Sequence, residues 1–305
     1  MTLLDRAIVR LLPVVPKPVV QLFSARYIAG PSLDDAVRVV GALNDGGKLG
    51  TIDVLGEEVS REQDARAIAV AYRKVFDEIE RDGLDSNVSI KLTALGLGLS
   101  YDVCRANLED VVRQAAEDRN FVRIDMEDSS TTDDTLRLYR ELRAAGHDNV
   151  GIVLQAHLRR TPGDIESLAD LRPNVRLCKG IYVEPPSIAF TEADAIRDNF
   201  IRCLDALLDG GSYVGVATHD EWLIREALEV LGEHGLARED YEFQMLLGVR
   251  EQRATELVDA GHRLRVYVPF GEQWYAYSLR RLQENPAMAG TIARAAVGRV
   301  LGRDA

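Results

Sequence analysis

Short runs of hydrophobic and β-branched residues recur along the chain, separated by longer segments whose apolar residues fall at helical spacing. Successive runs begin about 30 residues apart on average, which is the length of a β-strand followed by an α-helix. The pattern therefore predicts a series of strand-plus-helix units. The runs begin near Thr51, Val88, Phe121, Val150, Asn174, Tyr213, Tyr241 and Leu264.

The segments between the runs carry clear helix signals. Apolar residues between Ile68 and Ile79 lie on one helical face, and this pattern stops before Gly83. Further along, Thr161 followed by Pro162 predicts a helix start with Thr161 as the N-cap. Helices placed in this way would cover the outer side of the strands.

The strands predict a parallel sheet, because they read as apolar runs and are joined through helices. Eight such strands close into a barrel, so the predicted fold is a TIM-like (β/α)8 barrel. We expect a single domain, with a helical lead-in over residues 1–45, the barrel over 46–285 and a C-terminal helix over 286–305. A doubly wound open sheet is the alternative, but the chain offers only a Gly-Leu-Gly fragment at 96–98 of the dinucleotide-binding signature.

Composition and charge narrow the range of partners. Of the 305 residues, 46% are apolar and 28% are charged, which excludes a disordered chain. The net charge of −12 would repel phosphate backbones, so nucleic acid is not an expected partner. An anionic substrate would therefore need a local cluster of positive charges.

The cysteines, the histidines and one apolar stretch bear on location and cofactors. The three cysteines form no CxxC pair, which favours a reducing compartment such as the cytoplasm. The five histidines have no metal-ligand spacing, so no metal is expected. The stretch from Leu11 to Phe23 is broken by prolines and is too short to span a bilayer. We expect it to pack as an N-terminal arm, with peripheral contact to the inner face of the cell membrane as the alternative.

Polar residues gather late in the predicted strands or just after them. In (β/α)8 barrels the active site lies at the carboxyl ends of the strands, and buried polar groups are costly unless they are paired or used. An adjacent pair, Arg280 and Arg281, follows the eighth strand and can bind a carboxylate through bidentate contacts. The polar residues at the strand ends are Glu57, Lys91, Asp125, Gln155, Arg176, Lys179, Thr218, His219 and Tyr267.

Seven segments, in this order and at barrel-strand spacing, resemble the monofunctional bacterial proline dehydrogenases. These enzymes share a catalytic domain with the bifunctional proline utilization A proteins. The likeness extends from Glu57 to Glu284. The segments are SIKLTALG (89–96), VRIDMED (122–128), VRLCKGIY (175–182), VATHD (216–220), EFQMLLG (242–248), RVYVPFG (265–271) and YSLRRLQEN (277–285).

The resemblance implies a distorted (β/α)8 barrel that uses FAD to oxidise L-proline to Δ1-pyrroline-5-carboxylate and passes the electrons to a quinone. It implies Asp125 and Arg176 as the catalytic pair, with Arg176 reaching the flavin N5 atom. Lys91, Arg280 and Arg281 would hold the proline carboxylate. The bifunctional relatives carry an aldehyde dehydrogenase module for which this chain has no room, so a separate pyrroline-5-carboxylate dehydrogenase is an expected partner.

Further roles follow from the same resemblance. Glu57 would pair with Arg280 as a gate over the pocket. Tyr267 implies selectivity for proline, because hydroxyproline-preferring relatives carry a smaller residue there. Ile181 stands where the family often has alanine, and we expect it to narrow the pocket or shift the flavin. The residues implied to line the substrate ring are Tyr182, Leu246, Tyr267 and Tyr277, and those implied to contact FAD are Met126, Gln155, Lys179, Gly180, Ile181, Thr218 and His219.

Two other functions remain open on the residues alone. Lys91 and Lys179 lie where a barrel lyase or aldolase places its Schiff-base lysine. A barrel without catalytic activity that binds an acidic metabolite through Arg280 and Arg281 is the third hypothesis. The colour of the purified protein separates them, because only the flavoenzyme would be yellow and bleached by proline.

Overall fold

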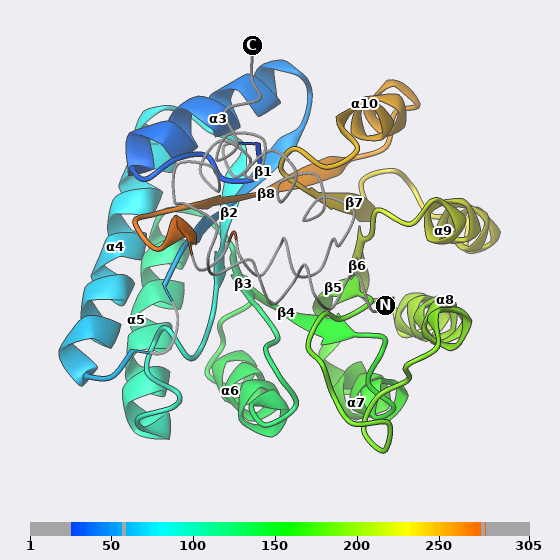
Figure 1. Ribbon diagram of the computed structural model, residues 1–305, viewed down its shortest axis with the longest axis horizontal. Coiled ribbons are helices and arrows are strands. Elements are labelled where there is room, and N and C mark those ends of the chain that lie inside the picture. The colour runs from blue at the N-terminus through cyan, green and yellow to red at the C-terminus, as the bar shows by residue number, and fades with distance from the viewer. Residues whose placement is uncertain (1–25, 57–58, 276–277, 279–305) are drawn as a thin grey trace, which may run out of the picture.

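Eight parallel strands form a closed barrel in sequential order, and β8 pairs with β1 to complete it (Figure 1). The computed structural model describes residues 26–56, 59–275 and 278. All eight predicted strands are present, so the prediction of a (β/α)8 barrel is confirmed. The strands are β1 (Leu49–Val54), β2 (Ser86–Ile90), β3 (Val122–Ile124), β4 (Val150–Gln155), β5 (Asn174–Cys178), β6 (Tyr213–Ala217), β7 (Tyr241–Leu246) and β8 (Leu264–Phe270).

Helices form a ring outside the barrel, as Figure 1 shows. Part of the expected lead-in is the helix α3, whereas residues 1–25 and the expected C-terminal helix over 286–305 lie outside the described residues. The described helices are α3 (Leu33–Asp45), α4 (Glu62–Arg81), α5 (Tyr101–Glu117), α6 (Thr132–Ala144), α7 (Thr161–Leu168), the short 3-10 helix η2 (Ala169–Leu171), α8 (Ala193–Asp209), α9 (Glu221–Glu233) and α10 (Glu251–Asp259).

Local sequence signals explain where several helices begin. Ser32 and Asp35 form a capping box at the start of α3. The side chain of Asp220 caps α9 by accepting from the backbone N–H of Trp222. Thr161 is not the N-cap that we expected for α7: it is the first helical residue, and its hydroxyl donates to the carbonyl of Gln155 at 2.6 Å.

The helix α3 packs on the outer side of β1 and β8. This contact requires Gly50 on β1, because a Cβ there would lie 2.9 Å from the Cγ1 atom of Val40 and from the hydroxyl of Ser86. Glycine at this position therefore lets α3 approach the sheet closely. The helix α3 therefore covers the outer face of the barrel where β1 and β8 meet.

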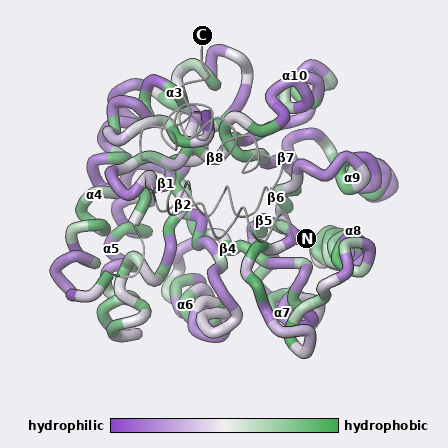
Figure 2. Tube along the Cα trace, viewed as in Figure 1, coloured by the Kyte–Doolittle hydropathy of each residue, from purple (hydrophilic) through white to green (hydrophobic). Residues whose placement is uncertain are grey.

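The strands differ from the near-continuous apolar runs that we expected. In β2, Val88 and Ile90 belong to the apolar core, whereas Ser89 between them bonds to the polar residue Asp125. Apolar residues of the strands pack against the helices, and Figure 2 shows hydrophobic and hydrophilic residues alternating around the ring of helices. Polar side chains on β2, β5, β7 and β8 and just after β3 bond to one another between strands that are not neighbours, which places them inside the barrel. In the part of the chain that the structure describes, no helix has the length and hydropathy needed to cross a membrane.

Candidate active site

Arg176 on β5 lies at the centre of a buried polar cluster inside the barrel. Its Nη1 atom donates to Oδ1 of Asp125 at 2.7 Å and to the hydroxyl of Ser89 at 3.1 Å. The Ser89 hydroxyl donates to the same carboxylate oxygen at 2.6 Å. Only 7% of the Arg176 side chain and 13% of the Asp125 side chain are exposed, so this charge-assisted pair holds the guanidinium firmly. The Nη2 atom of Arg176 has no hydrogen-bond partner among the described residues.

Lys91, just after β2, lies beside this pair. Its Nζ atom donates to Oδ2 of Asp53 on β1 at 2.8 Å and lies 3.9 Å from Oδ2 of Asp125. The hydroxyl of Tyr267 on β8 lies 3.3 Å from the same Nζ atom and donates to Oδ2 of Asp125 at 2.9 Å. Four of the predicted site residues therefore converge: Lys91, Asp125, Arg176 and Tyr267.

Asp53 was not among the predicted site residues. Its side chain is buried, and its Oδ1 atom has no partner within the described ranges. Burial raises the pKa of Asp53, and the positive charge of Lys91 opposes that shift. The sequence did contain a signal for Asp53, because its carboxylate lies within the apolar run TIDVLG (51–56). A charge buried in a strand needs a partner, so Asp53 could have been predicted to pair with a cation inside the barrel.

The barrel interior holds an excess of positive charge, in contrast to the chain as a whole. Burial and the charge of Arg176 lower the pKa of Arg123 to about 9, so this arginine stays charged at neutral pH. The excess comes from Arg123 and Arg265 against Glu242 at the amino ends of the strands, whereas Lys91 and Arg176 balance Asp53 and Asp125 at the carboxyl ends. Among the described residues, the interior cations are Lys91, Arg123, Arg176 and Arg265, and the interior carboxylates are Asp53, Asp125 and Glu242.

Gln155 ends β4 and ties it to the segment after β3. Its Nε2 atom donates to the carbonyl of Met126 at 3.3 Å and to that of Glu127 at 3.2 Å. Its Oε1 atom is buried and has no partner in the part of the chain described. This oxygen is therefore an acceptor at the carboxyl end of the strands that a bound molecule can use.

Gly180 follows β5 in a conformation that a side chain would not tolerate. Its φ is +97°, and an added Cβ would overlap the ring of His157. His157 itself is buried, and burial lowers its pKa. The next residue, Ile181, is 40% exposed, and Tyr182 is half-buried. The backbone at Gly180 thus packs closely against His157, and the predicted contact of Gly180 with FAD stays a prediction.

Lys179 lies at the end of β5 and binds a carboxylate at the start of α9. Its Nζ atom donates to Oδ2 of Asp220 at 3.3 Å, and Arg197 on α8 donates to the same oxygen at 2.9 Å. Burial alone would raise the pKa of Asp220, but Arg197 and Lys179 together lower it. Asp220 and Arg197 were not predicted as site residues, and Asp220 is recognisable only as a helix-capping aspartate.

Thr218 and His219 follow β6 and are held by backbone contacts. The Thr218 hydroxyl accepts the backbone N–H of Asp220 at 3.1 Å. The Nε2 atom of His219 accepts the backbone N–H of Leu246 at 2.9 Å, so a neutral His219 carries its proton on Nδ1. This contact joins the ends of β6 and β7, where two of the predicted ring- and cofactor-contacting residues meet.

Some predicted residues lie outside the described part of the chain. They are Glu57, Tyr277, Arg280 and Arg281. The gate of Glu57 and Arg280 therefore stays a prediction, and so does most of the carboxylate clamp, meaning Lys91, Arg280 and Arg281. Within the described ranges, no group of three His, Cys, Asp or Glu side chains could hold a metal ion.

Both lysines of the Schiff-base hypothesis are ion-paired. Lys91 binds Asp53, and Lys179 binds Asp220. A Schiff-base lysine must present its amine to a carbonyl, whereas both of these amines are directed at carboxylates. The geometry therefore does not favour the lyase or aldolase alternative.

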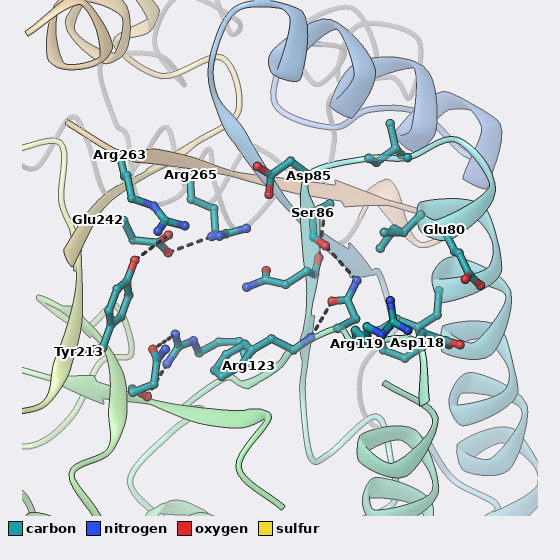
Figure 3. Close-up of a pocket in the computed structure, with 18 residues that line it drawn as sticks. Glu80, Asp85, Ser86, Asp118, Arg119, Arg123, Tyr213, Glu242, Arg263 and Arg265 are labelled. Atoms are coloured by element: carbon teal, nitrogen blue, oxygen red, sulfur yellow. Dashed lines mark hydrogen bonds and ion pairs between the residues drawn. The ribbon is translucent and has the colours of Figure 1, made fainter. Parts of the chain in front are cut away.

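A cavity of about 550 Å³ lies at the opposite end of the barrel (Figure 3). It is lined by residues at the amino ends of the strands, including Ser86, Tyr213, Glu242 and Arg265. In (β/α)8 barrels that end contributes to stability, whereas the chemistry takes place at the carboxyl ends. The cavity is therefore not the candidate active site, although its wall includes charged residues of the interior.

A closed (β/α)8 barrel with a buried cluster of arginine, carboxylate and lysine side chains is typical of the barrel enzymes, whose catalytic residues lie at the carboxyl ends of the strands. Residues 36–294 match the family model described as Proline dehydrogenase. The chain therefore belongs to the proline dehydrogenase family.

Individual relatives agree with this family. The chain is 38% identical to "Proline dehydrogenase 1" of Bacillus subtilis (strain 168) over 272 residues, which cover 89% of this chain and 90% of that protein. It is 37% identical to "Proline dehydrogenase" of Deinococcus radiodurans over 271 residues, covering 88% of this chain and 87% of the relative. Among solved structures, proline utilization A from Bdellovibrio bacteriovorus inactivated by N-propargylglycine matches with a TM-score of 0.80 and 27% identity, over 86% of this chain and 32% of that chain.

Proposed function

We propose that the chain oxidises L-proline to Δ1-pyrroline-5-carboxylate with FAD as the hydride acceptor. Membership of the family carries proline oxidation, the first step of proline catabolism, and implies a flavin cofactor. The observation that carries the assignment of residues is the convergence of Lys91, Asp125, Arg176 and Tyr267 inside one end of the barrel. When bound, the flavin would take the hydride from the ring carbon attached to the proline nitrogen.

The substrate is proposed to bind through its carboxylate. Lys91 offers a positive charge whose position Asp53 fixes, and Arg280 and Arg281 are proposed to complete the clamp. Glu57 is proposed to pair with Arg280 as a gate. The side chains proposed to line the substrate ring are Tyr182, Leu246, Tyr267 and Tyr277.

Arg176 and Asp125 are proposed as the catalytic pair. The Nη1 atom of Arg176 donates to Asp125 and Ser89, so Nη2 is the atom that would be available to hold the N5 atom of the flavin. The positive charge of Arg176 would favour the reduced, anionic form of the flavin. Asp125 keeps the guanidinium in place and orders the hydroxyl of Tyr267.

The partnerless polar atoms suit a flavin. The Oε1 atom of Gln155 can accept a ring N–H, and the Nη2 atom of Arg176 can donate to a ring nitrogen or carbonyl. Gly180 leaves room for the ring of His157 beside the backbone that is proposed to contact the cofactor. The residues proposed to contact FAD, besides Arg176 and Gln155, are Met126, Lys179, Gly180, Ile181, Thr218 and His219.

The remaining partners are proposed from the resemblance and the composition. The electrons would leave to a quinone, and the product would pass to a separate pyrroline-5-carboxylate dehydrogenase. Three cysteines without a CxxC pair favour the cytoplasm. Peripheral membrane contact through residues 11–23 is the alternative to a packed arm.

The test is anaerobic titration of the purified protein. We expect a yellow protein whose flavin, released and identified as FAD, is bleached by L-proline and recovers its colour with a soluble quinone. A colourless protein that borohydride traps with a keto acid would support the lysine mechanism instead. A protein that binds proline without bleaching contradicts the oxidation.

A further inference from the structure

Gln244 on β7 contacts Arg176 inside the barrel, and Glu242 on the same strand contacts Gln244. Neither residue has a role in the reaction as described so far. The Nε atom of Arg176 donates to Oε1 of Gln244 at 2.5 Å. The Nε2 atom of Gln244 then donates to Oε1 of Glu242 at 2.6 Å. A continuous chain of buried hydrogen bonds therefore connects the proposed flavin-facing arginine to a carboxylate deeper in the barrel.

We propose that Gln244, held by Glu242, is a positioning residue that sets the orientation of the Arg176 guanidinium. This inference rests on the proposed function, because it gives Gln244 a part in the reduction of the flavin by proline.

The neighbours of the Gln244 amide allow it only one orientation. The Nε–H of Arg176 is a donor, so it needs the amide oxygen. An ionised Glu242 is an acceptor, so it needs the amide nitrogen. If the amide were flipped, its NH2 group would face the Nε–H of Arg176 and its oxygen would face the carboxylate of Glu242, and both contacts would be repulsive. The amide oxygen of Gln244 therefore always faces Arg176.

Glu242 is well anchored in its charged form. Its Oε1 atom accepts from the Nε atom of Arg265 on β8 at 2.8 Å, and Arg265 also donates to the carbonyl of Gly50 at 2.5 Å. Burial alone would raise the pKa of Glu242, but the charges of Arg265 and Arg123 and the hydrogen bonds lower it. The other carboxylate oxygen meets the hydroxyl of Tyr213 at 3.3 Å, at the wall of the cavity in Figure 3.

The backbone leaves space for Gln244 at one particular position. Gly215 on β6 pairs with Arg176 on β5 and with Glu242 on β7. A Cβ on Gly215 would overlap the Nε2 atom of Gln244, so any larger residue there displaces the amide. The glycine therefore places Gln244 within reach of Arg176.

Two edges of the guanidinium are thus fixed by protein. Gln244 accepts a hydrogen bond from the Nε atom, whereas Asp125 and Ser89 accept hydrogen bonds from the Nη1 atom. A planar group held at two edges has no freedom to rotate, and a preorganised charge needs no rearrangement during the reaction. Without Gln244, the guanidinium would be held from one side only and the direction of Nη2 would vary.

The experiment compares Gln244→Met with the wild-type protein, both loaded with FAD. We expect flavin reduction at saturating proline to slow by about tenfold, because a misdirected charge weakens stabilisation of the reduced flavin. Affinity for proline should change by less than about twofold, because Gln244 does not touch the proposed carboxylate clamp. The reduction potential of the flavin, measured by reductive titration without proline, should become more negative. The variant Arg176→Met serves as the reference, because it shows how far rate and potential change when the positive charge is lost completely.

A second variant and a matched control separate positioning from general support of the fold. Gly215→Ala displaces Gln244 without altering its chemistry and should slow reduction in the same direction. Tyr213→Phe removes a hydrogen bond from the same Glu242 at its far side and should leave both rate and potential unchanged. The proposal is overturned if Gln244→Met or a folded Gly215→Ala keeps the wild-type rate and potential, or if Tyr213→Phe changes them equally.

Failure of the proposed function would look different. If proline does not reduce the wild-type flavin, the oxidation proposal fails, and the potential alone then decides the role of Gln244. If wild type is reduced and the variants match it, only the positioning inference fails.

Discussion

The hydroxyl of Tyr267 on β8 donates to Oδ2 of Asp125, just after β3, at 2.9 Å across the interior of the barrel. The other oxygen of Asp125 accepts hydrogen bonds from Arg176 and Ser89. A single carboxylate thus connects the proposed wall of the substrate pocket to the proposed flavin-facing arginine. Substitutions of Tyr267 therefore act on the shape of the pocket and on the orientation of Asp125, and two variants are needed to separate the two effects.

Tyr267→Ser should lower the turnover of proline and narrow the difference between proline and hydroxyproline. The variant opens space and offers a hydroxyl to the substrate, whereas rejection of a hydroxyl by packing alone is modest, on the order of a hundredfold. The measurement is kcat/KM for both substrates.

Tyr267→Phe is the matched control, because it keeps the ring and removes the hydroxyl with its contacts to Asp125 and Lys91. It should slow both substrates and preserve the preference for proline. If Tyr267→Ser slows the two substrates equally, Tyr267 supports the cluster without recognising the ring.

Arg281→Ala should raise KM for proline roughly tenfold to a hundredfold and leave the FAD content unchanged. Loss of one charge-assisted contact to a partly buried carboxylate costs about 1.5–3 kcal/mol. Arg66→Ala removes an exposed arginine on α4 and should change binding by less than about 0.5 kcal/mol. Normal proline binding by Arg281→Ala would show that this arginine is not part of the clamp.

Gly180→Ala should destabilise the fold and reduce the FAD content. The residue has φ +97°, and the added methyl group would overlap His157. Gly83→Ala is the control, because Gly83 has φ +60° and no atom lies within 4 Å of its added Cβ. We expect Gly180→Ala to cost about 1–3 kcal/mol more than the control in chemical unfolding, the usual cost of overpacking. Equal losses would mean that His157 moves aside freely.

Glu242→Gln should destabilise the protein most at neutral pH. The pKa of Glu242 lies below its ordinary value of 4.5 in the folded state, so its ionised form stabilises the fold above that pH. This contribution is lost as the pH falls through the folded-state pKa. Breaking a buried pair costs about 3–5 kcal/mol, so the difference between wild type and variant should be near this size at pH 7 and shrink below pH 4.5.

Urea unfolding across this pH range measures the effect. Glu256→Gln, which removes an exposed carboxylate on α10, should show a difference of about 0–1 kcal/mol at every pH. A difference for Glu242→Gln that stays constant on acidification would mean that Glu242 is not ionised in the fold.

The sequence predicted the eight strands and their order because hydrophobic runs and helical stripes are local signals. It also placed Lys91, Asp125, Arg176 and Tyr267 at one site, since carboxyl ends of parallel strands meet at one end of a barrel. Asp53 escaped prediction, because local patterns do not show which residues meet across the interior.

A periodic signal was present for the interior. Several strands carry polar residues two positions apart, and residues two apart on a strand share a face. The pairs are Thr51 with Asp53, Ser89 with Lys91, Arg123 with Asp125, Glu242 with Gln244 and Arg265 with Tyr267. We expected apolar strands and so treated these residues singly, but the spacing indicates a polar inner face.

The polar inner face has a thermal consequence. Unfolding a barrel filled with branched apolar side chains exposes apolar surface, which raises the heat capacity, whereas exposure of polar surface lowers it. Arg123, Arg176, Glu242, Gln244 and Arg265 occupy the interior here and are buried. The heat-capacity change on unfolding should therefore be smaller than that of an apolar-filled barrel of equal length, and the stability of this protein should vary less steeply with temperature.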